Sequence, residues 1–239
     1  MKKPKILGIT IARGGSKGVP RKNIRPILGI PLIAYTIMEA KKSKYLTRYV
    51  VCSDDEDIRR AAIEYGAEAP FSEPAEIATD TTYSIVPIQY TVNWVEAQEN
   101  EKYDYVVELM CTNPLKTVED IDGVIEKLIA TGADSVISVV KLEDHHPARI
   151  KKIIDDKIVD FCVPELSGRR QELRPFAYVR NGSIYSMKRD VLMVDNVRYG
   201  SENSRPYIMP EERTVNIDTM MDFKIAEALI TLNHKDVKT

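Results

Sequence analysis

The 239-residue chain lacks several features that would place it in a familiar class of protein. It has only three cysteines, Cys52, Cys111 and Cys162, and no C-x-x-C pair, which favours reduced thiols in a cytoplasmic protein. No apolar run reaches the length of a membrane helix, and we do not expect the charged N-terminus to act as a signal peptide. A net charge of −2 leaves no global basic field for nucleic acid. We therefore expect a soluble cytoplasmic protein with neither a nucleic-acid nor a membrane partner.

What the sequence does contain is an apolar run, residues 6–11, followed by a basic, glycine-rich loop, residues 13–22. The run can form one buried strand, and ligands of α/β sheets bind beyond the carboxyl ends of such strands. Glycines let backbone N–H groups approach phosphate oxygens, and cationic side chains neutralise a polyphosphate. The glycine spacing fits neither a Walker loop nor a dinucleotide fingerprint. The loop therefore predicts a triphosphate site of another kind, with the cations Arg13, Lys17, Arg21 and Lys22.

Stretches typical of strands and of helices alternate through most of the chain. We expect strands at residues 6–11, 49–53, 105–109, 135–140, 183–187 and 213–217, and helices at 31–43, 56–65, 84–99, 117–132 and 219–232. Thr117 and Asp120 form a capping-box pattern at the start of one helix. The alternation predicts an α/β fold of βαβ units, with a Rossmann-like, mostly parallel sheet and helices on both of its faces. Arg13, Ser53 and residues 111–113 then meet at the carboxyl edge of the sheet.

The alternation breaks after residue 141. Residues 150–154 and 157–162 have the pattern of two strands joined by a turn, and a polar, arginine-rich segment follows them. We therefore divide the chain into an α/β core, residues 1–141 and 183–239, and a projecting dimerisation insertion, residues 142–182. The hairpin carries several isoleucines, and an isolated hairpin needs an apolar partner. A second copy of the chain would supply that cover, which predicts a homodimer.

The basic loop also resembles the signature of the acylneuraminate cytidylyltransferase family, the CMP-sialic acid synthetase group. That signature is a strand, an Ala-Arg pair, a Ser-Lys-Gly loop and a Pro followed by Lys-Asn, here Ala12-Arg13, Ser16-Lys17-Gly18, Pro20 and Lys22-Asn23. The resemblance continues at spaced points to about residue 222. It implies the fold of the nucleotide-diphospho-sugar transferases and a cytidylyltransferase activity. Such an enzyme uses Mg²⁺ to couple CTP to an acidic sugar, a 2-keto-3-deoxy nonulosonic acid, and releases pyrophosphate.

The resemblance implies roles for residues along most of the chain. A nucleotide site is implied at Ala12, Arg13, Gly14, Gly15, Ser16, Lys17, Lys22, Asn23, Asp80 and Ser84. A sugar site is implied at Met110, Thr112, Asn113, Arg149, Arg170 and Asn181, where the basic residues of the insertion reach across the dimer. Asp218 and Asn216, which a strand would place on one face, are the expected Mg²⁺ ligands. Arg13, Lys17 and Asp218 are expected to carry the chemistry.

Three positions depart from the family's pattern. Asn216 stands where an aspartate is usual, which puts a two-carboxylate metal site in question, and Asp218 by itself also suits a helix cap. Glu73 replaces an arginine that contacts the base, which weakens the inference of cytosine. Met110 replaces a glutamine associated with the sugar, which favours a legionaminate- or pseudaminate-type acid over N-acetylneuraminate. The alternatives are a nucleotidyltransferase using another nucleotide or a sugar 1-phosphate, and a non-catalytic nucleotide-binding regulator.

Overall fold

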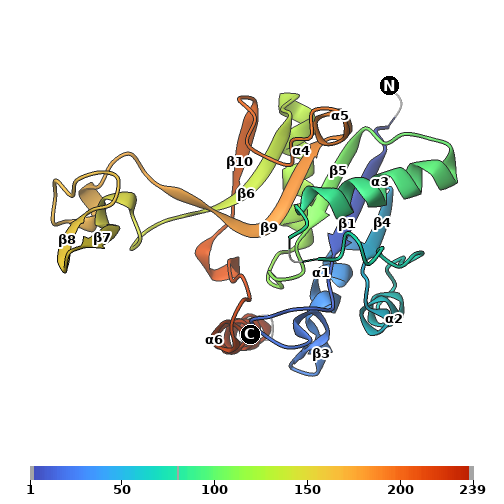
Figure 1. Cartoon of the computed structure of the whole chain (residues 1–239), viewed down its shortest axis with the longest axis horizontal. Helices are drawn as coiled ribbons and strands as arrows, with labels where there is room; N and C mark the ends of the chain where they lie inside the picture. The colour runs from blue at the N-terminus through green and yellow to red at the C-terminus, as the bar shows by residue number, and fades with distance from the viewer. Residues whose placement is uncertain (1–2, 80, 237–239) are drawn as a thin grey trace.

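The core of the protein is a six-stranded sheet with helices on both of its faces (Figure 1). The computed structural model describes residues 3–79 and 81–236. The strands lie in the order β10-β6-β9-β5-β1-β4; β9 is antiparallel to both of its neighbours, and the other pairs are parallel. Their bounds are β1 (Ile6–Ile11), β4 (Arg48–Cys52), β5 (Tyr105–Leu109), β6 (Ser135–Lys141), β9 (Tyr178–Lys188) and β10 (Ser204–Ile208). The predicted α/β fold with a mostly parallel sheet is confirmed.

Two helical layers cover this sheet. The helices α1 (Leu32–Ala40), α2 (Glu56–Glu64) and α4 (Val118–Thr131) pack on one face, and α3 (Ile85–Glu99) and α5 (Arg189–Met193) pack on the other. Neighbouring residues of β1 serve both layers, since Ile6 belongs to the first cluster and Leu7 and Ile9 to the second. The strand is apolar throughout because both of its faces are buried. Within residues 3–79 and 81–236, no helix is long and apolar enough to cross a membrane.

The last helix packs on a third, smaller cluster next to the basic loop. α6 (Met220–Asp236) lies against the start of α1 and against a short hairpin of β2 (Pro26–Ile27) and β3 (Ile30–Pro31). Val19 of the basic loop and Ile217 are fully buried in the same cluster. The cluster therefore brings the chain before α6 to the side of the basic loop.

Local signals in the sequence set the ends of several helices. Both hydrogen bonds of the predicted capping box between Thr117 and Asp120 are present at the start of α4. Asp55 caps α2 by accepting a hydrogen bond from the Ile58 backbone N–H at 3.0 Å. Gly132 follows α4 with a φ of +60°, a left-handed conformation that favours glycine. These boundaries are set by a few neighbouring residues, which explains why the sequence predicts them.

The predicted strand at residues 213–217 is wrong, and the sixth strand of the sheet is β10 instead. The 3₁₀ turn η4 (Glu211–Arg213) occupies part of that range, and the residues after it pack on the third cluster rather than on a strand. β10 pairs with β6 at the edge of the sheet and contains Pro206. Proline has no N–H to donate, so it is tolerated in an edge strand although it argues against a strand in sequence. Other 3₁₀ turns are η1 (Lys22–Ile24), η2 (Pro147–Arg149) and η3 (Arg170–Glu172).

A separate hairpin projects away from the sheet (Figure 1). β7 (Lys151–Ile154) and β8 (Lys157–Asp160) pair antiparallel, as the sequence predicts. Asp155 and Asp156 connect them with φ values of +49° and +59°, as a tight two-residue turn requires. The side chains of this hairpin are poorly covered: Ile153 is 76% exposed and Ile158 is 75% exposed. The hairpin therefore presents an apolar surface that the other residues in 3–79 and 81–236 do not cover.

Candidate active site

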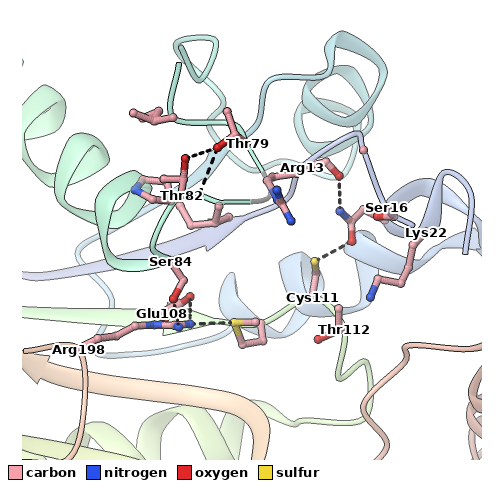
Figure 2. A pocket seen from close by; sticks show the side chains of 16 residues that line it. Arg13, Ser16, Lys22, Thr79, Thr82, Ser84, Glu108, Cys111, Thr112 and Arg198 are labelled. Atoms are coloured by element: carbon pink, nitrogen blue, oxygen red, sulfur yellow. Dashed lines mark hydrogen bonds and ion pairs between the residues drawn. The ribbon is translucent and has the colours of Figure 1, made fainter. Parts of the chain in front are cut away.

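A cavity of about 280 Å³ opens at the carboxyl ends of β1 and β5 (Figure 2). Its walls come from the basic loop, the segment leading into α3, the turn after β5 and the segment after α5. The lining residues are Ile11, Arg13, Gly15, Ser16, Lys22, Asn23, Ile77, Thr79, Thr82, Ser84, Pro87, Glu108, Met110, Cys111, Thr112 and Arg198. The expectation that the loops after β1 and β5 meet at this edge of the sheet is confirmed.

The basic loop forms the positively charged side of the cavity. Figure 2 shows the side chains of Arg13 and Lys22 directed toward its interior. Asn23 is buried in the same wall, and its side-chain amide donates to the Arg13 carbonyl at 2.9 Å. The Cys111 thiol in turn donates to Asn23 Oδ1 at 3.3 Å. The loop is thereby fixed to the turn after β5, which holds its cations over the carboxyl ends of the two strands.

Asp218 lies beside the same loop although it is far away in sequence. Lys22 Nζ donates to the Ile217 carbonyl at 2.8 Å and to Asp218 Oδ1 at 3.0 Å. The amide of Asn216 donates to Asp218 Oδ2 at 2.6 Å, so the predicted pair of metal ligands is side by side. A Cβ on Gly18 would collide with the Asp218 carbonyl oxygen, so only glycine permits this close approach. The fold therefore brings the two predicted ligands to the basic loop.

The cap of α6 is made by other residues than Asp218. Asp222 accepts hydrogen bonds from the backbone N–H groups of Asp218 at 3.0 Å and Thr219 at 2.7 Å. The Thr219 hydroxyl also accepts from the Asp222 N–H at 3.3 Å. Since Thr219 and Asp222 cap the helix, the Asp218 carboxylate does not serve as a helix cap. Its side chain is 64% exposed beside Lys22.

Arg21 points away from the cavity, which corrects the expectation that it neutralises a triphosphate. Its guanidinium lies 3.0 Å from Asp55 Oδ2 and 2.6 Å from Asp57 Oδ2 at the start of α2. The backbone of Arg21 has a φ of +56°. This turn sends its side chain to α2 and that of the next residue, Lys22, to Asp218.

Other residues of the predicted nucleotide site shape the basic loop without lining the cavity. Ala12 is buried, and its N–H donates to the Cys52 carbonyl at 2.9 Å. The N–H of Gly14 donates to Asp54 Oδ1 at 2.9 Å. Lys17 is exposed on the loop and is not one of the lining residues. Asp80 lies outside the described residues.

The turn after β5 supplies two of the predicted sugar-site residues to the cavity wall. Met110 and Thr112 line it. Asn113 and Asn181 are buried behind the wall, where Asn113 Nδ2 donates to the Asn181 carbonyl at 3.5 Å. Ser138 Oγ donates to Asn181 Oδ1 at 2.6 Å. Asn113 and Asn181 therefore hold the wall in place, and neither is among the residues that line the cavity.

A fully buried lysine, Lys116, holds the same turn in place through hydrogen bonds. Lys116 Nζ donates to Thr36 Oγ1 at 2.9 Å, to the Met110 carbonyl at 2.7 Å and to the Asn113 carbonyl. Three acceptors match the three N–H groups of an ammonium. Burial lowers the pKa of Lys116 to about 7. The conformation of the cavity wall at Met110 thus depends on one side chain inside the core.

The basic residues of the projecting segment do not reach this chain's own cavity. Arg149 Nε lies 3.6 Å from Glu165 Oε1, and Arg170 Nη1 lies 2.5 Å from Asp144 Oδ1. Both side chains are nearly half exposed. Neither is among the residues that line the cavity, so a role at a sugar site would require the cavity of another subunit.

Glu73 is buried and does not line the cavity, which corrects the expectation that it faces a base. Its side chain is 2% exposed, and among the described residues neither carboxylate oxygen has a hydrogen-bond partner. Burial raises the pKa of Glu73 to about 7, with Asp54 adding to the rise and Arg13 opposing it. The glutamate therefore gives no information about which base the site would take.

The sequence gives no role to a buried ion pair that forms one end of the cavity. Arg198 Nε lies 2.8 Å from Glu108 Oε2, and Arg198 Nη2 lies 2.7 Å from Glu108 Oε1. Arg198 Nη1 also donates to Ser84 Oγ at 2.6 Å. A glutamate within a buried strand signals that a partner must exist, because an unpaired buried charge is costly. The partner lies 90 residues away and could not be chosen from sequence.

Comparison with known proteins finds a matching family model and relatives that span almost the whole chain. The family model described as cytidylyltransferase matches residues 7–160. A pseudaminic acid cytidylyltransferase of Campylobacter jejuni (strain 81-176) is 31% identical over 97% of this chain and 98% of the relative. A CMP-N,N'-diacetyllegionaminic acid synthase of Campylobacter jejuni (strain NCTC 11168) is 31% identical over 98% of both chains. The solved structure of a CMP:2-keto-3-deoxy-manno-octonic acid synthetase complexed with CTP shares the fold, with a TM-score of 0.70, 17% identity and coverage of 96% of this chain and 99% of that chain.

Proposed function

The chain belongs to the cytidylyltransferase family, and from this premise we propose that it couples CTP to a 2-keto-3-deoxy nonulosonic acid, giving a CMP-sugar and pyrophosphate. One observation carries the proposal: the basic loop and the turn at Met110 line one cavity, with Asp218 held beside the loop. Identity of 31% to enzymes named for pseudaminic and for diacetyllegionaminic acid, over almost the full chain, supports an acceptor of legionaminate, pseudaminate or sialate type.

The reaction needs positioning and charge neutralisation rather than a covalent enzyme group. A hydroxyl oxygen of the acceptor attacks the α-phosphorus in line, the bond from that phosphorus to the bridging oxygen breaks, and pyrophosphate leaves. The acceptor's hydroxyl proton passes to solvent. Arg13 and Lys22 face the cavity and would neutralise the triphosphate, while Gly15 and Ser16 line the same side and their backbone N–H groups could donate to phosphate oxygens.

We propose that Asp218 and Asn216 hold Mg²⁺ through their side-chain oxygens. Within the described part of the chain, no three histidine, cysteine or acidic side chains gather as a metal site, so the protein offers a sparse set of ligands. That set fits Mg²⁺, which often binds one or two protein oxygens and takes substrate phosphates and water for the rest. When bound, Mg²⁺ would neutralise charge that builds on the leaving pyrophosphate.

We propose that the active form is a cytoplasmic homodimer in which the projecting hairpin is covered by the second copy. The exposed isoleucines of β7 and β8 support such an interface. Neither Arg149 nor Arg170 is among the residues that line this chain's own cavity, which supports a role for them in the partner's site. The three free cysteines, Cys52, Cys111 and Cys162, are consistent with a reducing compartment.

A pyrophosphate-release screen tests the function directly. Purified protein is incubated with Mg²⁺, with each of four nucleoside triphosphates and with each of several acceptors, including N,N'-diacetyllegionaminic, pseudaminic and N-acetylneuraminic acids and sugar 1-phosphates. We expect release only with CTP and a nonulosonic acid, and none when EDTA removes the metal. Release with another nucleotide or with a sugar 1-phosphate would favour the alternative transferase. CTP binding without turnover of any acceptor would favour a regulator.

A further inference from the structure

The end of the cavity opposite the basic loop is built around the ion pair of Glu108 and Arg198 (Figure 2). Glu108 is 2% exposed, and the Arg198 side chain is 13% exposed. Two parallel hydrogen bonds of 2.7 and 2.8 Å join the guanidinium to the carboxylate. Such a paired, bidentate contact fixes the plane of the guanidinium, so its remaining donor has a defined direction.

Neighbouring side chains hold Arg198 from several sides. The guanidinium carbon lies 5.1 Å from the centre of the Tyr185 ring and 5.3 Å from that of Tyr199. Ser84 accepts a hydrogen bond from Nη1, and the sulfur of Met110 lies 3.7 Å from Nη2. Met110 occupies a position expected to contact the sugar, and Ser84 one expected to contact the nucleotide, so the pair lies where the two expected sites meet, at the end of the cavity away from the basic loop.

The charge at this end of the cavity differs from that of the basic loop. Arg13 and Lys22 carry the cationic side (Figure 2), whereas the carboxylate of Glu108 balances the charge of Arg198. The contacts of Arg198 with described residues use four of the five N–H groups of a guanidinium. The pair can thus hydrogen-bond a ligand but offers no net charge to bind a carboxylate or a phosphate.

We propose that the Arg198–Glu108 pair is a specificity determinant that hydrogen-bonds a neutral polar substituent, an acylamino or hydroxyl group, on the tail of the acceptor acid. This inference rests on the proposed function. A buried donor that loses its partner is costly, so an acceptor without such a group binds more weakly even if its carboxylate and reacting hydroxyl are in place. The carboxylate of the acid then binds elsewhere, and the pair recognises the opposite end of the molecule.

The test separates binding of the acceptor from binding of CTP. Arg198→Lys keeps a positive charge opposite Glu108 but removes the planar fork. We expect the KM of this variant for N,N'-diacetyllegionaminic acid to rise about tenfold to a hundredfold, and its KM for CTP to change less than about twofold. Arg189→Lys is the matched control, because Arg189 at the start of α5 pairs with Glu96 of α3 at 2.8 Å and does not line the cavity. That variant should leave both KM values unchanged.

Two further measurements exclude an indirect effect. The double variant Glu108→Leu/Arg198→Met removes both charges together, so no buried charge is left unpaired. It should show the same rise in the KM for the acceptor as Arg198→Lys, with an unchanged melting temperature. 2-Keto-3-deoxygluconic acid, whose six-membered ring form has no tail, should inhibit wild type and Arg198→Lys equally. Three results would each overturn the inference. The KM for CTP could rise as much as the KM for the acceptor in Arg198→Lys, or the KM for the acceptor could rise equally in Arg189→Lys. The third is weaker inhibition of Arg198→Lys than of wild type by the tailless acid. If wild type turns over no acid with CTP, the proposed function fails and the inference falls with it.

Discussion

At the scale of single residues, the structure contains a carboxyl group in an unfavourable place. Glu73 is buried, and neither of its carboxylate oxygens accepts a hydrogen bond from any residue that the structure describes. Burial raises its pKa to about 7, so the folded state prefers the protonated form. The unfolded chain ionises near the ordinary glutamate value. As the pH rises from about 4.5 to 7, Glu73 ionises in the unfolded state but stays mostly protonated in the folded state. The unfolded state is therefore stabilised relative to the folded state, and the free energy of unfolding falls.

Replacing Glu73 with glutamine should remove this pH dependence. At pH 8 we expect Glu73→Gln to raise the free energy of unfolding by up to about 3 kcal/mol, because it removes an ionised group from a buried site. At pH 5, where the carboxyl is mostly protonated in the folded state, the gain should fall below about 1 kcal/mol. Urea unfolding of both proteins at the two pH values measures the difference.

The control for this experiment is Glu76→Gln, because Glu76 is exposed on the same segment. It should change the free energy of unfolding by less than about 0.5 kcal/mol at either pH. A gain in Glu73→Gln that is the same at pH 5 and pH 8 would show that the stabilisation comes from packing and not from the ionisation of Glu73.

At the scale of elements, the basic loop sends neighbouring cations to different places. Lys22 reaches Asp218 and the cavity, whereas Arg21 pairs with Asp55 and Asp57 at the start of α2. Both residues belong to the same short segment, and sequence alone would treat them as equal phosphate ligands. The left-handed backbone at Arg21 separates them. Of these two cations, Arg21 therefore attaches the loop to the start of α2, and Lys22 lines the cavity.

This division of roles predicts a large difference between two alanine variants. Lys22→Ala should lower kcat/KM for CTP by about tenfold to a hundredfold, since a charge-assisted hydrogen bond is lost. Arg21→Ala should lower it by less than about threefold and should cost less than about 1 kcal/mol of stability, because its ion pairs are partly exposed. Steady-state kinetics with CTP varied at saturating acceptor measures both. Equal losses in the two variants would contradict the division.

At the scale of the whole molecule, the projecting segment is the feature that supports the proposed homodimer. The hairpin of β7 and β8 stands apart from the sheet (Figure 1) and exposes Ile153 and Ile158. A two-stranded hairpin is marginal in water without an apolar cover. Arg170 lies on the same segment and does not line its own cavity. If a second copy covers the hairpin, Arg170 can enter the neighbouring site.

Mixing two inactive variants tests whether the sites are completed between subunits. An Asp218→Asn subunit and an Arg170→Ala subunit should each be nearly inactive as homodimers. If residue 170 acts in the partner's site, one site of the mixed dimer holds both changes and the other holds neither. Each verified heterodimer should then recover about half of the wild-type activity.

The matched control for mixing is Arg169→Ala, because Arg169 is exposed and pairs with Glu172 on the same segment. This variant should remain active by itself. Sedimentation velocity should give a dimer for every protein in the experiment. A monomer, or verified heterodimers without recovered activity, would contradict a site shared between subunits.

The sequence by itself determined the features that depend on neighbouring residues. The apolar run before a glycine-rich basic loop predicted β1 and the basic side of the cavity. The pattern at Thr117 and Asp120 predicted a helix start, and the alternation of elements predicted a mostly parallel sheet. These predictions succeed because helix caps, strand periodicity and right-handed connections are decided locally or by topology.

Only the tertiary structure decided which distant groups meet and which side chains are buried. Lys22 pairs with Asp218 across 196 positions, and Arg198 pairs with Glu108 across 90. Sequence shows that the glutamate of a buried strand needs a partner, but the path of the chain selects it. Glu73 occupies a position expected to face a base and is buried instead. Burial and long-range pairing are properties of the packed molecule, because they depend on how layers meet and not on the residues next in the chain.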